Sequence, residues 1–329
     1  MGISIAANAG FEEAADAIVR GDLAGLRRLL DTQPGLVQAR STRDHGATLL
    51  HYVAANGVED DRQRTPPNIV AIAELLLEAG ADVDATANVY GGGATALGLA
   101  ATSVHPERAG VQEDLMRLLL AHGASIGPGL VRACLSNGRG RAAEFLADYG
   151  ADLELDEAAG VGRLDLVKAY FTEDGSLLPH AAQEQLQEGF LHACEYGRDE
   201  VAEYLIAHGV DLAALGPGGQ TSMHRSVIGG HPSTVRLLLR HGAPLETKNR
   251  YGGTVLEQAL WSAGHGGDAE TYLDILEALA AAGARLPERH VPVNARVDAW
   301  LASHGSHAEP GWFWYGEEPA GEAARNPPK

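Results

Sequence analysis

The chain has few cysteines, no long apolar run and no secretion signal. Its 329 residues include two cysteines, Cys134 and Cys194, which both fall within apolar helix patterns. Two such residues suit buried thiols in a reducing compartment better than a disulfide framework. No run approaches the roughly 18 apolar residues of a membrane span, and residues 1–10 lack a basic stretch followed by an apolar core. We therefore expect a cytoplasmic protein without a membrane partner.

Basic residues are also scarce. Lysine and arginine number 25 against 44 acidic residues, so the formal net charge is -19. Such a charge repels phosphate backbones and anionic membrane surfaces. Nucleic acid is therefore not an expected partner, and a cationic or neutral partner is favoured over an anionic one.

Motifs of catalysis and of metal binding are missing as well. The sequence has no HExxH, no paired CxxC and no GxSxG, and the glycine runs at residues 91–93 and 252–253 are not followed by the Lys-Ser/Thr of a phosphate-binding loop. No metal and no cofactor are expected. A metal site assembled across the fold, for example from His45, His105 and a carboxylate, is kept as a minor alternative.

What the chain does have is a repeated phrase. A leucine-rich run followed by Gly-Ala or Gly-Val occurs at residues 75–84, 118–124, 205–211 and 237–243, with starts 43 residues apart for the first pair and 32 for the second. A second phrase precedes several copies, as in Thr48-Leu49-Leu50-His51 and Thr221-Ser222-Met223-His224. The period and both phrases resemble those of ankyrin repeats, which recur about every 33 residues.

This resemblance implies an all-α solenoid of about eight helix-turn-helix repeats. We expect residues 1–10 to be a leader, 11–286 the repeat array, 287–308 a capping helix, and 309–329 an aromatic and acidic tail. In the tail, Trp312 to Tyr315 are expected to dock on the cap or over the groove. Phrases at residues 90–92 and 251–253 are similar to those of a group of bacterial ankyrin proteins that carry inserted loops.

Aligning the repeats predicts two inserted loops and the roles of two histidines. Residues 58–68 and 102–110 are expected to be loops that leave the turn between the two helices of their repeats. By resemblance to the family, His51 and His224 are expected to be structural, each ring bridging backbone groups of neighbouring repeats.

The same alignment predicts which side chains line the concave groove. In the family, the position after the motif histidine and the two before the turn glycine point to the concave face. At these positions, the predicted ligand-binding residues are Tyr52, Asn56, Tyr196, Arg225, Gln258 and Trp261. The loops between repeats add His45 and Tyr251, and the second insertion adds His105. Their aromatic, cationic and amide groups are typical of a polar-rimmed binding site.

The sequence thus predicts a monomeric recognition protein that binds a peptide, a protein or a small ligand in the concave groove. The alternative is an enzyme built on the same scaffold. In that case His192 and Glu195, three residues apart on one helix face, would be the catalytic acid/base pair of a lyase, isomerase, cyclase or hydrolase without an organic cofactor.

Overall fold

The computed structural model describes residues 2–179 and 181–309. The chain divides into two compact units, unit 1 (Met1–Asp152) and unit 2 (Leu153–Lys329). Both consist of helix pairs, and the expected all-α repeat fold is confirmed. The aromatic residues predicted to dock, Trp312 to Tyr315, lie outside the described residues.

Unit 1 contains two rows of helices in which each helix packs on the next of its row. The inner row is α1 (Gly2–Arg20), α3 (Leu49–Tyr52), α5 (Ala96–Thr102) and α8 (Leu130–Ser136). The outer row is α2 (Leu23–Thr32), α4 (Ile69–Glu78), α7 (Gln112–Ala121) and α9 (Gly140–Tyr149). The connections contain η1 (Pro34–Gln38), η2 (Asp60–Arg62), α6 (Val104–Arg108) and the antiparallel hairpin of β1 (Thr86–Ala87) with β2 (Ala94–Thr95).

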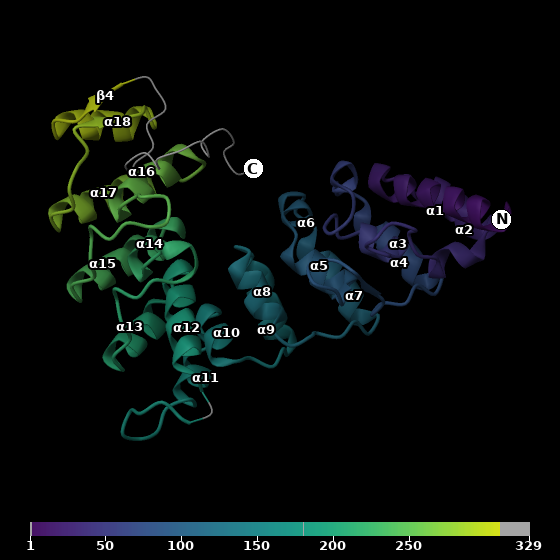
Figure 1. Ribbon diagram of the computed structural model, residues 1–329, viewed down its shortest axis with the longest axis horizontal. Coiled ribbons are helices and arrows are strands. Elements are labelled where there is room, and N and C mark those ends of the chain that lie inside the picture. The colour runs from purple at the N-terminus through teal and green to yellow at the C-terminus, as the bar shows by residue number, and fades with distance from the viewer. Residues whose placement is uncertain (1, 180, 310–329) are drawn as a thin grey trace. The chain divides into compact units, whose positions relative to one another are not determined.

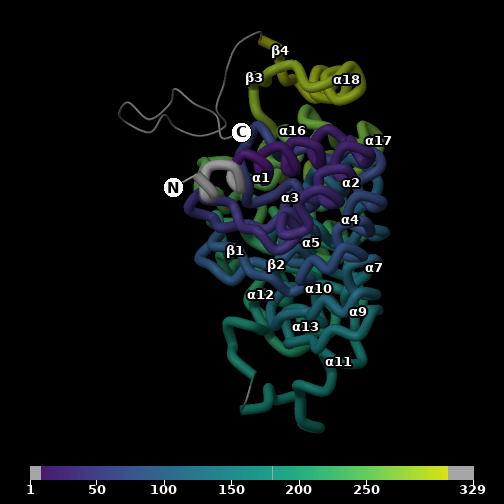
Figure 2. Tube along the Cα trace, turned by 90° about the vertical axis from the view of Figure 1, so that its right-hand side faces the viewer, coloured from purple at the N-terminus to yellow at the C-terminus, as the bar shows by residue number. Residues whose placement is uncertain are grey.

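Unit 2 repeats this arrangement, and Figure 1 shows its two rows side by side. The inner row is α10 (Leu155–Gly160), α12 (Gln183–Glu195), α14 (Ser222–Ile228) and α16 (Val255–Gly264). The outer row is α11 (Leu164–Lys168), α13 (Asp199–Ala207), α15 (Pro232–Arg240) and α17 (Ala269–Ala281). Before α14 lies η3 (Pro217–Gly219), and the unit ends with α18 (Ala295–Ser303), between the parallel strands β3 (Arg289–His290) and β4 (His307–Ala308). Figures 1 and 2 both place α18 at the end of the unit, beyond α17.

The leucines of the repeated phrase form the core. Leu76, Leu119 and Leu238 have no exposed surface, because each lies on the face of an outer-row helix that packs against the inner row. The predicted cap packs in the same way, with Val297 and Leu301 of α18 fully buried.

The Thr-x-x-His phrase starts inner helices as the family pattern predicts. In His51, Nδ1 accepts a hydrogen bond from the Thr48 N–H at 3.1 Å, and Nε2 lies 3.1 Å from the Ala94 carbonyl. His224 lies 3.2 Å from the Gly253 carbonyl in the same way. Burial lowers the pKa of both rings. Each histidine therefore ties its helix to the loop that leads into the next inner helix, as expected. We call such a loop a finger loop.

Two local features differ from the expectation. The first helix begins at Gly2, so it includes most of the segment predicted as a leader. The insertion at residues 102–110 is not a plain loop, because it forms α6. Ser103 caps this helix by accepting a hydrogen bond from the His105 N–H at 3.3 Å, and Pro106 lies in its first turn, where proline is tolerated.

Candidate functional site

A groove of about 1050 Å³ lies on the inner face of unit 1. It runs over α5 and α8 and is bounded by the β1–β2 hairpin, the finger loop before α8 and residues of both insertions. Its lining includes Asn56, Gln63, Asp84, Val89, Tyr90, Gly93, Gly98, Leu99, Thr102, Ser103, His105, Leu130, Ala133, Asn137 and Arg139. The predicted site residues Asn56 and His105 therefore belong to one groove.

Asn56 forms three hydrogen bonds at the wall of this groove. Its Nδ2 donates to the Leu99 carbonyl at 3.2 Å and to Thr102 Oγ1 at 3.3 Å. Its Oδ1 accepts a hydrogen bond of 2.6 Å from the Tyr90 hydroxyl. Tyr90 lies at the tip of the hairpin and is 75% exposed.

The charged groups of the groove already have partners. Asp84 accepts from the Ser125 N–H at 2.9 Å and from the Ser125 hydroxyl at 2.6 Å. Arg139 forms an ion pair of 3.0 Å with Glu107. The groove therefore presents a surface with little net charge, although the whole chain is strongly acidic.

Tyr52 and His45, two other predicted ligand residues, lie in a separate cluster. Tyr52 is fully buried, and its hydroxyl donates to Glu59 at 3.3 Å. His45 Nε2 lies 3.2 Å from the same carboxylate. The structure therefore does not bring these two residues to the wall of the groove with Asn56.

Around Glu59, charged side chains form a cluster that we call the N-terminal ion cluster. Arg43 pairs with Glu12 at 2.7 Å and with Glu59 at 2.8 Å. Arg62 pairs with Glu12 at 2.7 Å and with Asp16 at 2.6 Å. These pairs join the first finger loop and the first insertion to α1.

The cluster changes the ionisation of its members. Partial burial opposes ionisation of Glu12, but hydrogen bonds and attraction from Arg43 and Arg62 lower its pKa. Glu59 likewise has a lowered pKa, because hydrogen bonds from its own backbone N–H and from His45 outweigh burial. Burial, together with the Glu59 charge, raises the pKa of Tyr52 to about 12. The two carboxylates thus stabilise unit 1 in their ionised form.

In unit 2, the inner face carries the ion pair of Glu195 with Arg225, at 2.5 Å. Both side chains are almost buried, with 13% and 12% of their surface exposed. Burial raises the pKa of Glu195 and outweighs the attraction of Arg225. The two groups proposed from sequence for catalysis and binding are therefore bound to each other.

His192, the other member of the predicted acid/base pair, lies deeper. Its side chain is 1% exposed, and Nε2 lies 3.4 Å from Glu188 Oε1, one helical turn before it. Its ring lies 6.5 Å from that of Tyr196, centroid to centroid. The ring thus lies beneath the inner surface, among neighbours on α12.

The remaining predicted residues of unit 2 lie on α16 and the finger loop before it. Trp261 is 54% exposed and stacks on His265, with ring centroids 4.2 Å apart. Tyr251, at the tip of the finger, accepts a hydrogen bond from Arg250 at 2.6 Å. Gln258 lies 3.3 Å from Asn249 and is partly buried. Trp261 and Tyr251 are thus the large apolar side chains offered to solvent here.

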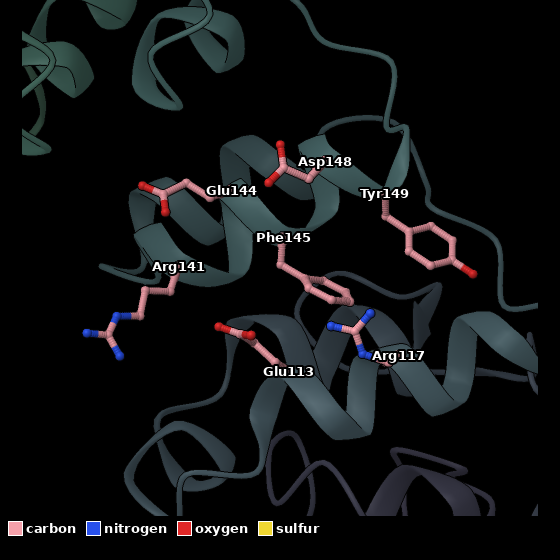
Figure 3. A pocket seen from close by; sticks show the side chains of 7 residues that line it. All are labelled: Glu113, Arg117, Arg141, Glu144, Phe145, Asp148 and Tyr149. Atoms are coloured by element: carbon pink, nitrogen blue, oxygen red, sulfur yellow. The ribbon is translucent and has the colours of Figure 1, made fainter.

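A second hollow of unit 1, about 510 Å³, lies on the outer row between α7 and α9. Figure 3 shows Arg117 facing the ring of Phe145 from the neighbouring helix, and the guanidinium carbon lies 5.0 Å from the ring centroid. Glu113, Arg141, Glu144, Asp148 and Tyr149 complete the lining. Because Arg117 covers the aromatic face, this hollow offers less apolar surface to a ligand than the inner groove.

A serine, a histidine and an aspartate lie close together in the C-terminal cap. His290 Nδ1 lies 2.8 Å from Ser306 Oγ, and Nε2 lies 3.5 Å from Asp298. Ser306 and His290 are buried, so the arrangement joins β3, β4 and α18 and does not present a nucleophile to solvent. Within residues 2–179 and 181–309, no group of three His, Cys, Asp or Glu side chains converges to hold a metal ion.

Comparisons with known proteins agree with this architecture. Family models described as ankyrin repeats match residues 155–249 and 190–289, and an ankyrin repeat model matches residues 45–88. The human Notch-regulated ankyrin repeat-containing protein is 33% identical over 103 residues, which cover 30% of this chain and 89% of the relative. The chain belongs to the ankyrin repeat family.

Other relatives of this ankyrin protein match shorter stretches. The Danio rerio Notch-regulated ankyrin repeat-containing protein A is 42% identical over 75 residues, 23% of this chain and 64% of the relative. The Mus musculus ankyrin repeat domain-containing protein 13B is 39% identical over 61 residues, 18% of this chain. That match spans only 10% of the relative's length. Ankyrin repeats indicate a scaffold for protein interaction. No helix in the described portion of this ankyrin protein is long and apolar enough to cross a membrane.

Sequence reasoning missed two features of these surfaces. Tyr90 is not among the predicted ligand-binding residues, although its hydroxyl bonds directly to Asn56. The N-terminal ion cluster was not foreseen, because Glu59 and Arg62 belong to an insertion that no repeat pattern describes. The sequence did contain a signal for this cluster, because basic Arg43 before α3 and acidic Glu59 and basic Arg62 after it carry opposite charges.

Proposed function

We propose that this ankyrin protein is a recognition protein that binds an extended segment of a partner protein in the inner groove of unit 1. The observation that carries the proposal is the groove itself. Its volume of about 1050 Å³ slightly exceeds the range of small-molecule pockets, ~300 to 1000 Å³. A peptide segment fits such a groove better than a small ligand does.

The floor of the groove is suited to close approach of a peptide backbone. Gly98 and Ala133 lie on its floor, and a Cβ added at Gly98 would meet no atom nearer than 3.4 Å. Val89 and Leu130, both partly exposed, line the groove and supply apolar groups. An extended chain would thus find backbone-sized space below and apolar contacts beside it.

The patch predicted in unit 2 is proposed as a second contact surface. Trp261 and Tyr251 are exposed there, and aromatic side chains contribute strongly to binding when a partner covers them. Arg225 is proposed to contribute by orienting Glu195, since its guanidinium is already paired.

The enzymatic alternative has less support. The raised pKa of Glu195 is a feature of many catalytic acids, but His192 is buried beneath the surface and lies beside Glu188. A general base must reach the proton that it removes. We therefore prefer recognition over acid/base catalysis at this position.

The proposal is tested by filling the groove. A Gly98→Leu variant should place a side chain in the groove, because a Cβ at Gly98 makes only ordinary contacts with Thr95 and Leu130, and its melting temperature checks that the fold is kept. Trp261→Ala removes an exposed ring of the proposed second contact surface and therefore identifies peptides that bind in unit 2 instead of in the groove. Peptides selected from a phage-displayed random library on the full chain should lose at least ~10-fold in affinity for Gly98→Leu, a change of about 1.4 kcal/mol. Unchanged affinity, at an unchanged melting temperature, would exclude the groove as the site.

A further inference from the structure

Backbone strain is concentrated at one wall of the unit 1 groove. In the part of the chain that the structure describes, the non-glycine residues with left-handed backbone are Ala55, with φ of 49°, and Tyr90, with φ of 51°. Ala55 directly precedes Asn56, whose Oδ1 accepts the Tyr90 hydroxyl. One strained residue thus donates this hydrogen bond, and the other directly precedes its acceptor in the sequence. Strain of this kind persists where the surrounding structure holds it and is frequent at ligand sites.

The amide of Asn56 has a defined orientation. Its Nδ2 faces the Leu99 carbonyl, which can only accept a hydrogen bond. Thr102 Oγ1, the other partner of Nδ2, donates its own proton to the Gly98 carbonyl at 2.9 Å. Two acceptors therefore hold the amino group against the floor. The carbonyl oxygen Oδ1 is directed away from them as a fixed hydrogen-bond acceptor.

The group that now occupies this acceptor is only weakly held in place. The Tyr90 side chain is 75% exposed, so its ring has little packing to lose. The three glycines that follow it have positive φ, and a Cβ added at Gly91 or Gly93 would meet no atom within 4 Å. The fingertip therefore has open space around it into which Tyr90 can withdraw.

We propose that Asn56 Oδ1 is the acceptor for a backbone N–H of the bound segment and that the Tyr90 hydroxyl holds this place in the free protein. This inference rests on the proposed function of the groove. The segment it specifies is extended and free of acidic side chains, with small side chains over the floor. Arg139 is paired with Glu107, whereas Asp84 keeps its negative charge although Ser125 donates two hydrogen bonds to it. An acidic side chain would therefore find no unpaired cation among them.

The first test removes the competing hydroxyl. Peptides from the phage-displayed random library are synthesised, and their dissociation constants for the full chain are measured by isothermal titration calorimetry. Tyr90→Phe should bind about 2- to 10-fold more tightly than the wild type, because one intramolecular hydrogen bond no longer has to be broken. Tyr149→Phe is the matched control, since that exposed tyrosine lies at the end of α9 in the outer row and does not line the groove. It should leave the affinity unchanged.

The second test identifies the donor. Each backbone N–H of the peptide is replaced in turn by N-methyl. One position should lose about 10-fold or more in the wild type, and in Asn56→Ala the same N-methyl group should have little further effect. If Asn56→Ala does not fold, Tyr90→Phe and the wild-type N-methyl series still decide the question.

The results of these tests distinguish the role of Asn56 from the proposed function of the groove. If Gly98→Leu abolishes binding while Tyr90→Phe binds equally or more weakly, the groove stands and the role of Asn56 is rejected. A library that yields only peptides insensitive to Gly98→Leu would reject the proposed function and this inference together. Tighter binding by Tyr90→Phe, with one sensitive N–H, supports both.

Discussion

Unit 1 and unit 2 are built from the same helix-pair repeat but differ in how closely the inner face is packed. In unit 2, Gly229 directly follows α14 and lets the backbone there approach the end of α12. A Cβ added at Gly229 would lie 1.9 Å from the Glu195 carbonyl oxygen. The paired side chains of Glu195 and Arg225 then cover the face. In unit 1, a Cβ added at Gly98 would make only ordinary contacts, and a groove remains open above it.

The difference indicates which part of such a fold holds the candidate site. Family models match residues 155–289 almost continuously, but in unit 1 they match only residues 45–88. The irregular unit contains the groove, because its insertions and its hairpin form walls that a regular repeat lacks. The repeat pattern thus determines the scaffold, and the departures from it create the candidate site.

The largest expected effect tests whether the two units are separate. Leu119→Ala in unit 1 and Leu238→Ala in unit 2 should each lower the free energy of unfolding by roughly 2 to 5 kcal/mol, because both side chains are fully buried. All four tryptophans lie in residues 153–329 of the sequence. In urea, Leu238→Ala should therefore shift the tryptophan fluorescence transition, whereas Leu119→Ala should shift only part of the circular dichroism transition. Equal shifts of both signals by both variants would show one cooperative unit instead.

A smaller effect is expected from closing the tight contact of unit 2. Gly229→Ala places a methyl group 1.9 Å from a backbone oxygen, so α12 and α14 must move apart. We expect a loss of roughly 1 to 3 kcal/mol, as for other overpacked sites. The fluorescence melting temperature measures it. A variant that melts with the wild type would show that the inner row of unit 2 is looser than the contact implies.

Much of this architecture could be predicted from the sequence. The leucine phrase and the Thr-x-x-His phrase identified the outer and inner helices, because periodic apolar residues and capping residues act locally. Asn56 and His105, two of the predicted ligand-binding residues, line the groove, and their binding of a ligand stays a prediction. Tyr52 is instead buried, because Glu59 of the insertion lies over its hydroxyl. Contacts made by an insertion depend on tertiary packing that no repeat alignment contains.

The third prediction compares the acid responses of the two units. The folded state lowers the pKa of Glu12, so its stabilising contribution is present above the usual value of 4.5 and is lost as the pH falls through the lowered pKa. Glu195 has the opposite sign. Its pKa is raised, so stability is lost as the pH rises from 4.5 through the raised value.

Glutamine variants separate these two contributions. Unfolding free energies of wild type, Glu12→Gln and Glu195→Gln are measured from about pH 3 to 8. The wild type should lose its advantage over Glu12→Gln below pH 4.5. Relative to Glu195→Gln, it should gain stability as the pH falls towards 4.5. Differences that do not vary with pH would mean that neither carboxyl titrates differently in the folded and unfolded chain.

The smallest expected effect, opposite in sign to that of Gly229→Ala, comes from Gly98→Ala. Glycine within a helix restricts the unfolded chain less than alanine does, so this substitution in α5 should stabilise unit 1 by about 0.5 kcal/mol. The new methyl group would lie 3.4 Å from Thr95 Oγ1 and 3.9 Å from Leu130 Cδ1, both ordinary contacts, and Gly98 N–H would keep its hydrogen bond to Thr95. The circular dichroism melting temperature measures the gain. If the variant is destabilised as strongly as Gly229→Ala, then the inner faces of the two units are equally closed and the open floor of the groove is not a real difference between them.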